Sequence, residues 1–178
     1  MKEEVVRQVM RKYFASKSIK TIPSKGAGPD LLRDGKAVEV KGSKYDFKRM
    51  LTQLKDYAYK FSEVSLVLPY DGLTFERIER LSIFNGLIKE ARGISLKVYL
   101  LAPHSEQRNI FYVYDTPNVE RIRAMMTAVP QPNIGFSLKD PHSTIGNAVE
   151  NLLTYSFVQN MKQYICSDYD HKVSKVQL

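Results

Sequence analysis

The chain has few of the residues on which several common kinds of site depend. It contains a single cysteine, Cys166, which excludes an intramolecular disulfide framework and a four-cysteine iron–sulfur cluster. Its three histidines, His104, His142 and His171, are scattered without the spacing of metal ligands. The sequence also lacks a glycine-rich phosphate loop of the nucleoside-triphosphatase type. We therefore expect this chain to bind no ATP.

Long apolar segments are missing as well. No run reaches the roughly 18 residues that would span a bilayer, and the first four residues lack the apolar core of a signal peptide. These features predict a cytoplasmic, intracellular protein with no membrane partner. The chain has 178 residues, of which 43% are hydrophobic and 26% charged, and this suits one globular domain or one domain with an extension.

Positive charge is in excess, and it is unevenly distributed. The net charge is +8; residues 1–60 hold 15 Lys/Arg and 7 Asp/Glu, whereas residues 61–178 hold 12 of each. A basic segment of this kind favours a partner with a phosphate backbone. The simpler alternative is ordinary solubility charge.

The segment from Asp30 to Lys41 is the most informative in the chain. Asp34-Gly35 between two apolar runs predicts a two-residue hairpin turn. That turn would place Asp30 opposite Glu39, with Lys41 on the same face as Glu39. Opposed carboxylates destabilise a sheet unless something offsets their charge, and a divalent metal ion is the obvious candidate. A metal held by two carboxylates beside a lysine suits phosphodiester hydrolysis.

Residues in and around this hairpin match a known family pattern. They are Glu3 or Glu4 in the first helix, Pro29-Asp30, Glu39-Val40-Lys41, and the pair Gln53 and Tyr57. Over roughly residues 1–70 the chain resembles the PD-(D/E)xK nuclease superfamily. Its RecB-like branch carries a similar Gln-x-x-x-Tyr motif, and its archaeal Holliday-junction resolvases share the early glutamate. A restriction-type enzyme of the same superfamily is a further alternative for this chain.

The resemblance implies a fold and an activity. The fold would be α/β and restriction-endonuclease-like, with a mixed central sheet flanked by helices and a C-terminal helical extension. The activity would be that of a Mg²⁺- or Mn²⁺-dependent deoxyribonuclease, an endonuclease of DNA repair, recombination or replication. The implied metal ligands are Asp30, Glu39, the Val40 carbonyl and Glu3, with Glu4 as the alternative to Glu3. The implied catalytic residues are Asp30, Glu39, Lys41, Gln53 and Tyr57.

Several basic residues follow the hairpin and could grip a DNA backbone. They are Lys44, Lys48, Arg49 and Lys55. Each of them taken alone is more simply explained as a solvated charge. A second class of function also fits the sequence, namely a non-catalytic nucleic-acid-binding or assembly subunit that keeps the nuclease fold.

Periodicity and turn residues predict an alternation of helices and strands. We expect helices over residues 2–16, from a Ser43–Asp46 capping box to about 61, and over 74–91 and 117–127, with strands at 19–22, 64–68, 96–101 and 110–114. The core domain would span residues 1–128 and a linker or loop 129–142. The last segment, 143–178, would hold a helix to about residue 166 and a polar, frayed tail. That helix would either close the core or form the surface of a homodimer.

Overall fold

The structure of the chain is a computed structural model that describes residues 1–23, 28–104, 107–116, 119–120, 122–123 and 173–178. In chain order its elements are α1 (Glu3–Ser16), β1 (Thr21–Pro23), β2 (Leu31–Arg33), β3 (Lys36–Val40), α2 (Phe47–Lys60), β4 (Val64–Pro69), the 3₁₀ helix η1 (Tyr70–Gly72), α3 (Phe75–Arg92), β5 (Lys97–Pro103), β6 (Ile110–Thr116) and β7 (Val173–Gln177).

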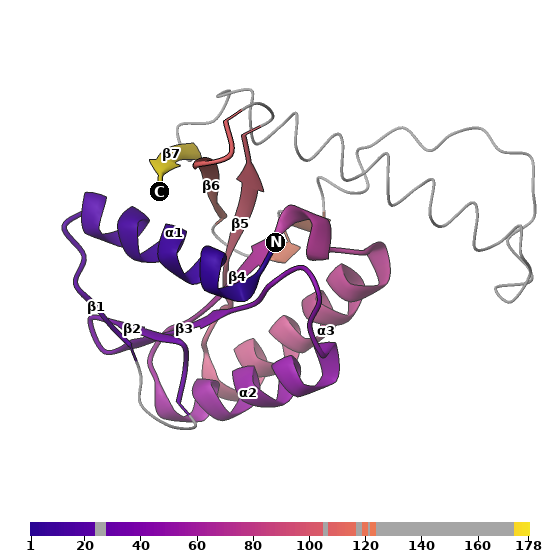
Figure 1. Ribbon diagram of the computed structural model, residues 1–178. Coiled ribbons are helices and arrows are strands. Elements are labelled where there is room, and N and C mark those ends of the chain that lie inside the picture. The colour runs from indigo at the N-terminus through magenta and orange to yellow at the C-terminus, as the bar shows by residue number, and fades with distance from the viewer. Residues whose placement is uncertain (24–27, 105–106, 117–118, 121, 124–172) are drawn as a thin grey trace, which may run out of the picture.

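The described strands form one mixed sheet. Its order is β1-β2-β3-β4-β5-β6-β7, with β3, β4 and β5 parallel and the other neighbours antiparallel. Helix α1 lies on one face of this sheet, and α2 and α3 lie on the other (Figure 1). The predicted α/β class with a mixed central sheet flanked by helices is confirmed.

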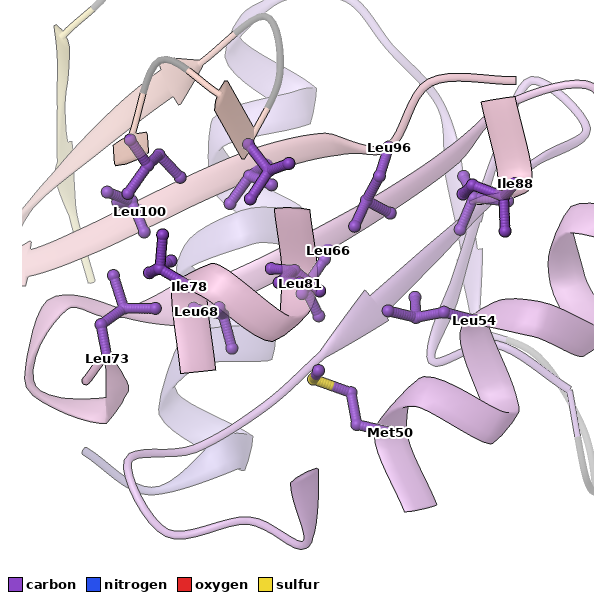
Figure 2. Close-up of a cluster of buried hydrophobic side chains, with 14 of the residues drawn as sticks. Met50, Leu54, Leu66, Leu68, Leu73, Ile78, Leu81, Ile88, Leu96 and Leu100 are labelled. Carbon is purple, nitrogen blue, oxygen red and sulfur yellow. The ribbon is translucent and has the colours of Figure 1, made fainter. Parts of the chain in front are cut away.

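Each face of the sheet has its own apolar core. On the α2/α3 face, Met50 and Leu54 of α2 and Ile78 of α3 pack against strand residues such as Leu66 and Leu100 (Figure 2). On the other face, α1 buries an i, i+3, i+4 stripe that includes Val6, Val9, Met10, Tyr13 and Phe14. The parallel strand β4 is buried along its whole length, as expected of a strand covered on both faces.

The hairpin turn forms where the sequence predicts it. Asp34 and Gly35 have φ values of 48° and 75°, as a type I′ turn requires of both central residues. The register pairs Arg33 with Lys36 and Leu31 with Val38, which confirms the predicted alignment. The ladder ends at Leu31, so the predicted cross-strand pair of Asp30 and Glu39 does not form. Asp30 instead contacts β3 through its side chain, which accepts a hydrogen bond from the Val40 N–H.

Helix α2 begins three residues later than the capping-box prediction places it. Its N-cap is Asp46, whose Oδ1 accepts a hydrogen bond from the Arg49 N–H at 2.9 Å. Ser43 instead donates to Asp71 Oδ1 at 2.7 Å, so its hydroxyl ties two loops together. Helix α3 begins and ends as predicted, with Thr74 as its N-cap and Gly93, at φ 68°, as its C-cap.

The prediction of a frayed tail over residues 168–178 is wrong for its last part. Val173–Gln177 form β7, which pairs antiparallel with β6. Val176 is buried opposite Phe111 and joins the core under α1. The apolar residues of this segment do not alternate, so its strand character comes from pairing with the free edge of β6.

The other C-terminal predictions fall mostly on residues outside the described part. Within the predicted helix 117–127, residues 119, 120, 122 and 123 are helical. The linker at 129–142 and the helix from 143 lie outside the described residues. Among the described helices, none is both long enough and apolar enough to cross a membrane.

Candidate metal-dependent catalytic site

Strand β3 directs Glu39 and Lys41 toward helix α2. The Lys41 ammonium forms an ion pair with Glu39 Oε1 and also donates to Gln53 Oε1 at 3.1 Å. Glu39 is almost completely buried, with 1% of its surface exposed. Gln53 and Tyr57 lie one helical turn apart on α2, and the structure therefore brings both next to Glu39.

Hydrogen bonding at Glu39 is incomplete among the described residues. Its Oε2 atom and the Tyr57 hydroxyl are both buried, and neither makes a hydrogen bond of normal geometry, although the hydroxyl is near enough to Glu39 to lower the pKa of that carboxyl. Burial, reinforced by the charge of Asp30, raises the pKa of Glu39 although Lys41 opposes the shift. Burial and the Glu39 charge raise the pKa of Tyr57 as well, so its phenol stays neutral. A buried carboxylate oxygen with no donor is costly in a structural role.

Asp30 joins this group from the loop that precedes β2. Its Oδ2 atom accepts the Val40 N–H at 2.8 Å, and its Oδ1 atom accepts from Arg7 at 2.7 Å. The amides of Ala37 and Lys41 bond toward β4. The Val40 carbonyl therefore faces the opposite side, where Asp30 lies, because the backbone groups of a strand alternate in direction.

Arg7 is a site residue that the sequence reasoning missed. One terminal nitrogen of Arg7 donates both to Asp30 Oδ1, at 2.7 Å, and to Glu3 Oε1, at 3.0 Å. The other terminal nitrogen donates to Glu4 Oε2 at 2.9 Å. The carboxylates of Asp30, Glu3 and Glu4 raise the pKa of Arg7, although partial burial lowers it. Arg7 follows Glu3 by four residues and Glu4 by three, and this spacing predicts ion pairs along one face of a helix.

The arrangement distinguishes Glu3 from Glu4. Glu3 shares a guanidinium nitrogen with Asp30, whereas Glu4 binds the outer nitrogen and leaves 62% of its side chain exposed. Gly42 helps to bring Glu3 near, because a Cβ at Gly42 would lie 2.9 Å from the Glu3 amide nitrogen. The close approach lets the chain leaving β3 pass the first turn of α1.

The donor set suits a magnesium or manganese ion. Oxygen ligands are available from Asp30, Glu39 and the Val40 carbonyl, and Mg²⁺ is usually held by one or two carboxylates together with water and substrate phosphate. The observation that favours a bound cation is the Glu39 Oε2 atom, which is buried and accepts no hydrogen bond of normal geometry from the described residues. Across the described residues, no group of three or more His, Cys, Asp or Glu side chains is arranged to hold a metal, so side chains alone do not enclose the ion.

The predicted DNA-contacting residues are all exposed to solvent. Lys48, Arg49 and Lys55 are exposed on α2, and Lys44 is exposed in the loop before it. Arg49 precedes Gln53 by one helical turn. Arg49 therefore lies on the side of α2 that carries Gln53, whereas Lys48 and Lys55 lie about 140–160° around the helix from Gln53.

A separate cavity lies near the other end of α1. It has a volume of about 320 Å³, and its lining includes Tyr13, Arg33, Lys97, Tyr99 and Asp115. None of the predicted site residues lines it.

Comparison with known proteins gives no independent identification. No family model, curated protein or solved structure matches the chain.

Proposed function

We propose that this protein is a metal-dependent DNA nuclease of the PD-(D/E)xK kind, with a restriction-endonuclease-like fold. The observation that carries the proposal is the group formed by Glu39, Lys41 and Asp30, in which one buried carboxylate oxygen of Glu39 accepts no hydrogen bond of normal geometry from the described residues. A structural ion pair would be expected to satisfy that atom. A site that receives a cation leaves it available.

The residues have distinct roles in the proposed reaction. Asp30, Glu39 and the Val40 carbonyl would hold Mg²⁺ or Mn²⁺, which would polarise the phosphate and lower the pKa of the attacking water. Lys41 places its ammonium beside the carboxylates, where it can stabilise negative charge that develops on the phosphoryl oxygens. The Gln53 side-chain oxygen fixes that ammonium at 3.1 Å.

Tyr57 and the four predicted DNA-contacting residues have supporting roles. The raised pKa of Tyr57 keeps its hydroxyl a neutral donor, which can hydrogen-bond to a phosphate oxygen or to Glu39. Lys44, Lys48, Arg49 and Lys55 would neutralise backbone phosphates on both sides of the scissile bond. DNA is the proposed partner, in agreement with the concentration of positive charge in residues 1–60.

A cleavage assay on a panel of substrates tests the proposal. The full chain would be incubated with labelled linear, nicked, forked and four-way DNA in Mg²⁺, in Mn²⁺ and in excess chelator. We expect cleavage of at least one substrate with metal and none with chelator. Asp30→Asn should abolish cleavage while keeping DNA binding, and Asp34→Asn in the hairpin turn is the matched control. DNA binding without cleavage of any substrate would favour the non-catalytic subunit instead.

A further inference from the structure

Arg7 occupies the place beside Asp30 that an incoming cation would need. The Val40 N–H already binds one Asp30 oxygen, and Arg7 binds the other at 2.7 Å. The same Arg7 nitrogen binds Glu3 at 3.0 Å. A divalent ion that uses the free lone pairs of Asp30 must therefore meet a guanidinium group already in contact with them.

The position of Arg7 is held by charge more than by complete hydrogen bonding. Its Nε atom is buried and has no hydrogen-bond partner among the described residues. A buried donor without an acceptor is unfavourable. The three carboxylates around the guanidinium compensate for this, and the contact with Asp30 is one that a stronger cation could replace.

We propose that Arg7 is a built-in counter-ion, which neutralises Asp30 in the metal-free protein and is displaced from it when a divalent cation binds. The proposal rests on the proposed nuclease site. Displacement needs no large movement of α1, because the other terminal nitrogen of Arg7 already binds Glu4 at the surface. Rotation of the side chain about that contact would release Asp30 and Glu3 together.

This arrangement has two consequences for the protein. In the metal-free state Arg7 reduces the repulsion between the carboxylates, so the fold does not depend on metal. Arg7 also opposes metal binding, because each binding event must break the ion pair between Arg7 and Asp30. Metal affinity is then lower than the carboxylates alone would give.

Calorimetry of Mn²⁺ binding to the full chain, without nucleic acid, tests this competition. We expect Arg7→Gln to bind Mn²⁺ about tenfold more tightly than the wild type. Arg11→Gln removes the same charge one turn further along α1, at an exposed position, and should bind within about twofold of the wild type. Equal or weaker binding by Arg7→Gln, with the wild type still binding, would overturn the role of Arg7.

Thermal unfolding provides the second readout. Without metal, Arg7→Gln should melt below the wild type, and saturating Mn²⁺ should raise its melting temperature more than that of the wild type. If Arg7→Gln does not fold, Arg7→Lys keeps the charge but cannot bridge the carboxylates in the same way, and its Mn²⁺ affinity should still exceed that of the wild type. An Arg7→Lys affinity equal to that of the wild type would contradict the proposal.

The outcomes separate this inference from the function on which it rests. If neither the wild type nor any Arg7 variant binds Mn²⁺, the metal site itself is wrong and both proposals fall. If the wild type binds Mn²⁺ through Asp30 and the Arg7 variants bind no better, only the counter-ion role falls.

Discussion

The two ends of one hairpin hold charged groups in very different states. At the turn, Arg33 donates to the Tyr99 hydroxyl at 2.9 Å and pairs with one oxygen of Glu63, while Lys36 binds the other oxygen at 2.9 Å. We call these four residues the Arg33 cluster. Both carboxylate oxygens of Glu63 are therefore occupied.

At the other end of the same hairpin, away from the turn, the hydrogen bonding of the buried carboxylate is incomplete. Glu39 is more deeply buried than Glu63, yet its Oε2 atom accepts no hydrogen bond of normal geometry from the described residues. We call Asp30, Glu39, Lys41, Gln53 and Tyr57 the carboxylate site. The difference teaches that burial and charge alone do not mark a functional site. On the proposed function, the carboxylate with complete hydrogen bonds supports the fold, and the one with incomplete hydrogen bonds receives the metal.

Replacing Lys41 should give the largest effect on the proposed activity among the changes that leave the metal ligands in place. We expect Lys41→Met to lower the cleavage rate by about a hundredfold or more, because one stabilising charge near the phosphoryl oxygens is lost. Mn²⁺ affinity measured by calorimetry should change little, since a protonated lysine has no lone pair for a metal. A loss of metal affinity as large as that of Glu39→Gln would mean that Lys41 holds the site together.

Breaking the Arg33 cluster should affect stability instead of function. Arg33→Met removes the more buried of the two cations that Glu63 binds and leaves Lys36 in place, and we expect a loss of about 2 kcal/mol in the free energy of unfolding. Denaturant unfolding measures that loss, and Mn²⁺ affinity serves as the control, which should stay at the wild-type value. Weakened metal binding in the folded variant would show that the two ends of the hairpin are not independent.

The sequence was informative about this hairpin for a physical reason. The Asp34-Gly35 turn fixes the register, and register with a period of two fixes which side chains share a face. The proximity of Glu39 and Lys41 follows from local rules of this kind. The helical spacing of Gln53 and Tyr57 likewise predicts that one face of α2 carries both.

Contacts between distant segments could not be obtained in the same way. Arg7 reaches Asp30 across 23 positions of the chain, and this contact depends on how α1 lies over the sheet edge. The strand β7 forms because the edge of β6 is free to pair, which no pattern within residues 173–177 indicates. The incomplete hydrogen bonding of the Glu39 Oε2 atom depends on three-dimensional packing, which the sequence does not show.

The pH dependence of stability tests the same comparison, with a smaller expected effect. The pKa of Glu39 is raised above its ordinary value of 4.5, so the folded state keeps a proton that the unfolded chain has released. The stability of the metal-free protein should therefore fall as pH rises above about 4.5 and through the raised pKa.

Glu39→Gln lacks this titration. Its melting temperature relative to the wild type should increase by a few degrees between about pH 4 and about pH 7 in chelator. Glu63→Gln is the matched control, because it removes a carboxylate whose oxygens are both occupied, and it should be less stable than the wild type at neutral pH. A constant difference between Glu39→Gln and the wild type across this range would contradict the raised pKa.

The salt dependence of DNA binding should show the smallest effect per residue. Each phosphate contact contributes about −0.9 to the slope of log K against log salt on duplex DNA. Charge reversal at Lys48 or Arg49 should make that slope shallower by about this amount. Lys175 is exposed on β7, at the opposite edge of the sheet from the hairpin, and its reversal should leave the slope unchanged. The reverse pattern would move the DNA-binding surface to the β7 edge.

The most direct test of the account compares two carboxylates that lie at opposite ends of the same hairpin. Mg²⁺-dependent DNA cleavage would be measured for Glu39→Gln and for Glu63→Gln, with each variant shown to be folded and to bind DNA. The account predicts that Glu39→Gln abolishes cleavage, whereas Glu63→Gln cleaves at close to the wild-type rate. Wild-type cleavage by Glu39→Gln would contradict the assignment of the incompletely bonded carboxylate to catalysis.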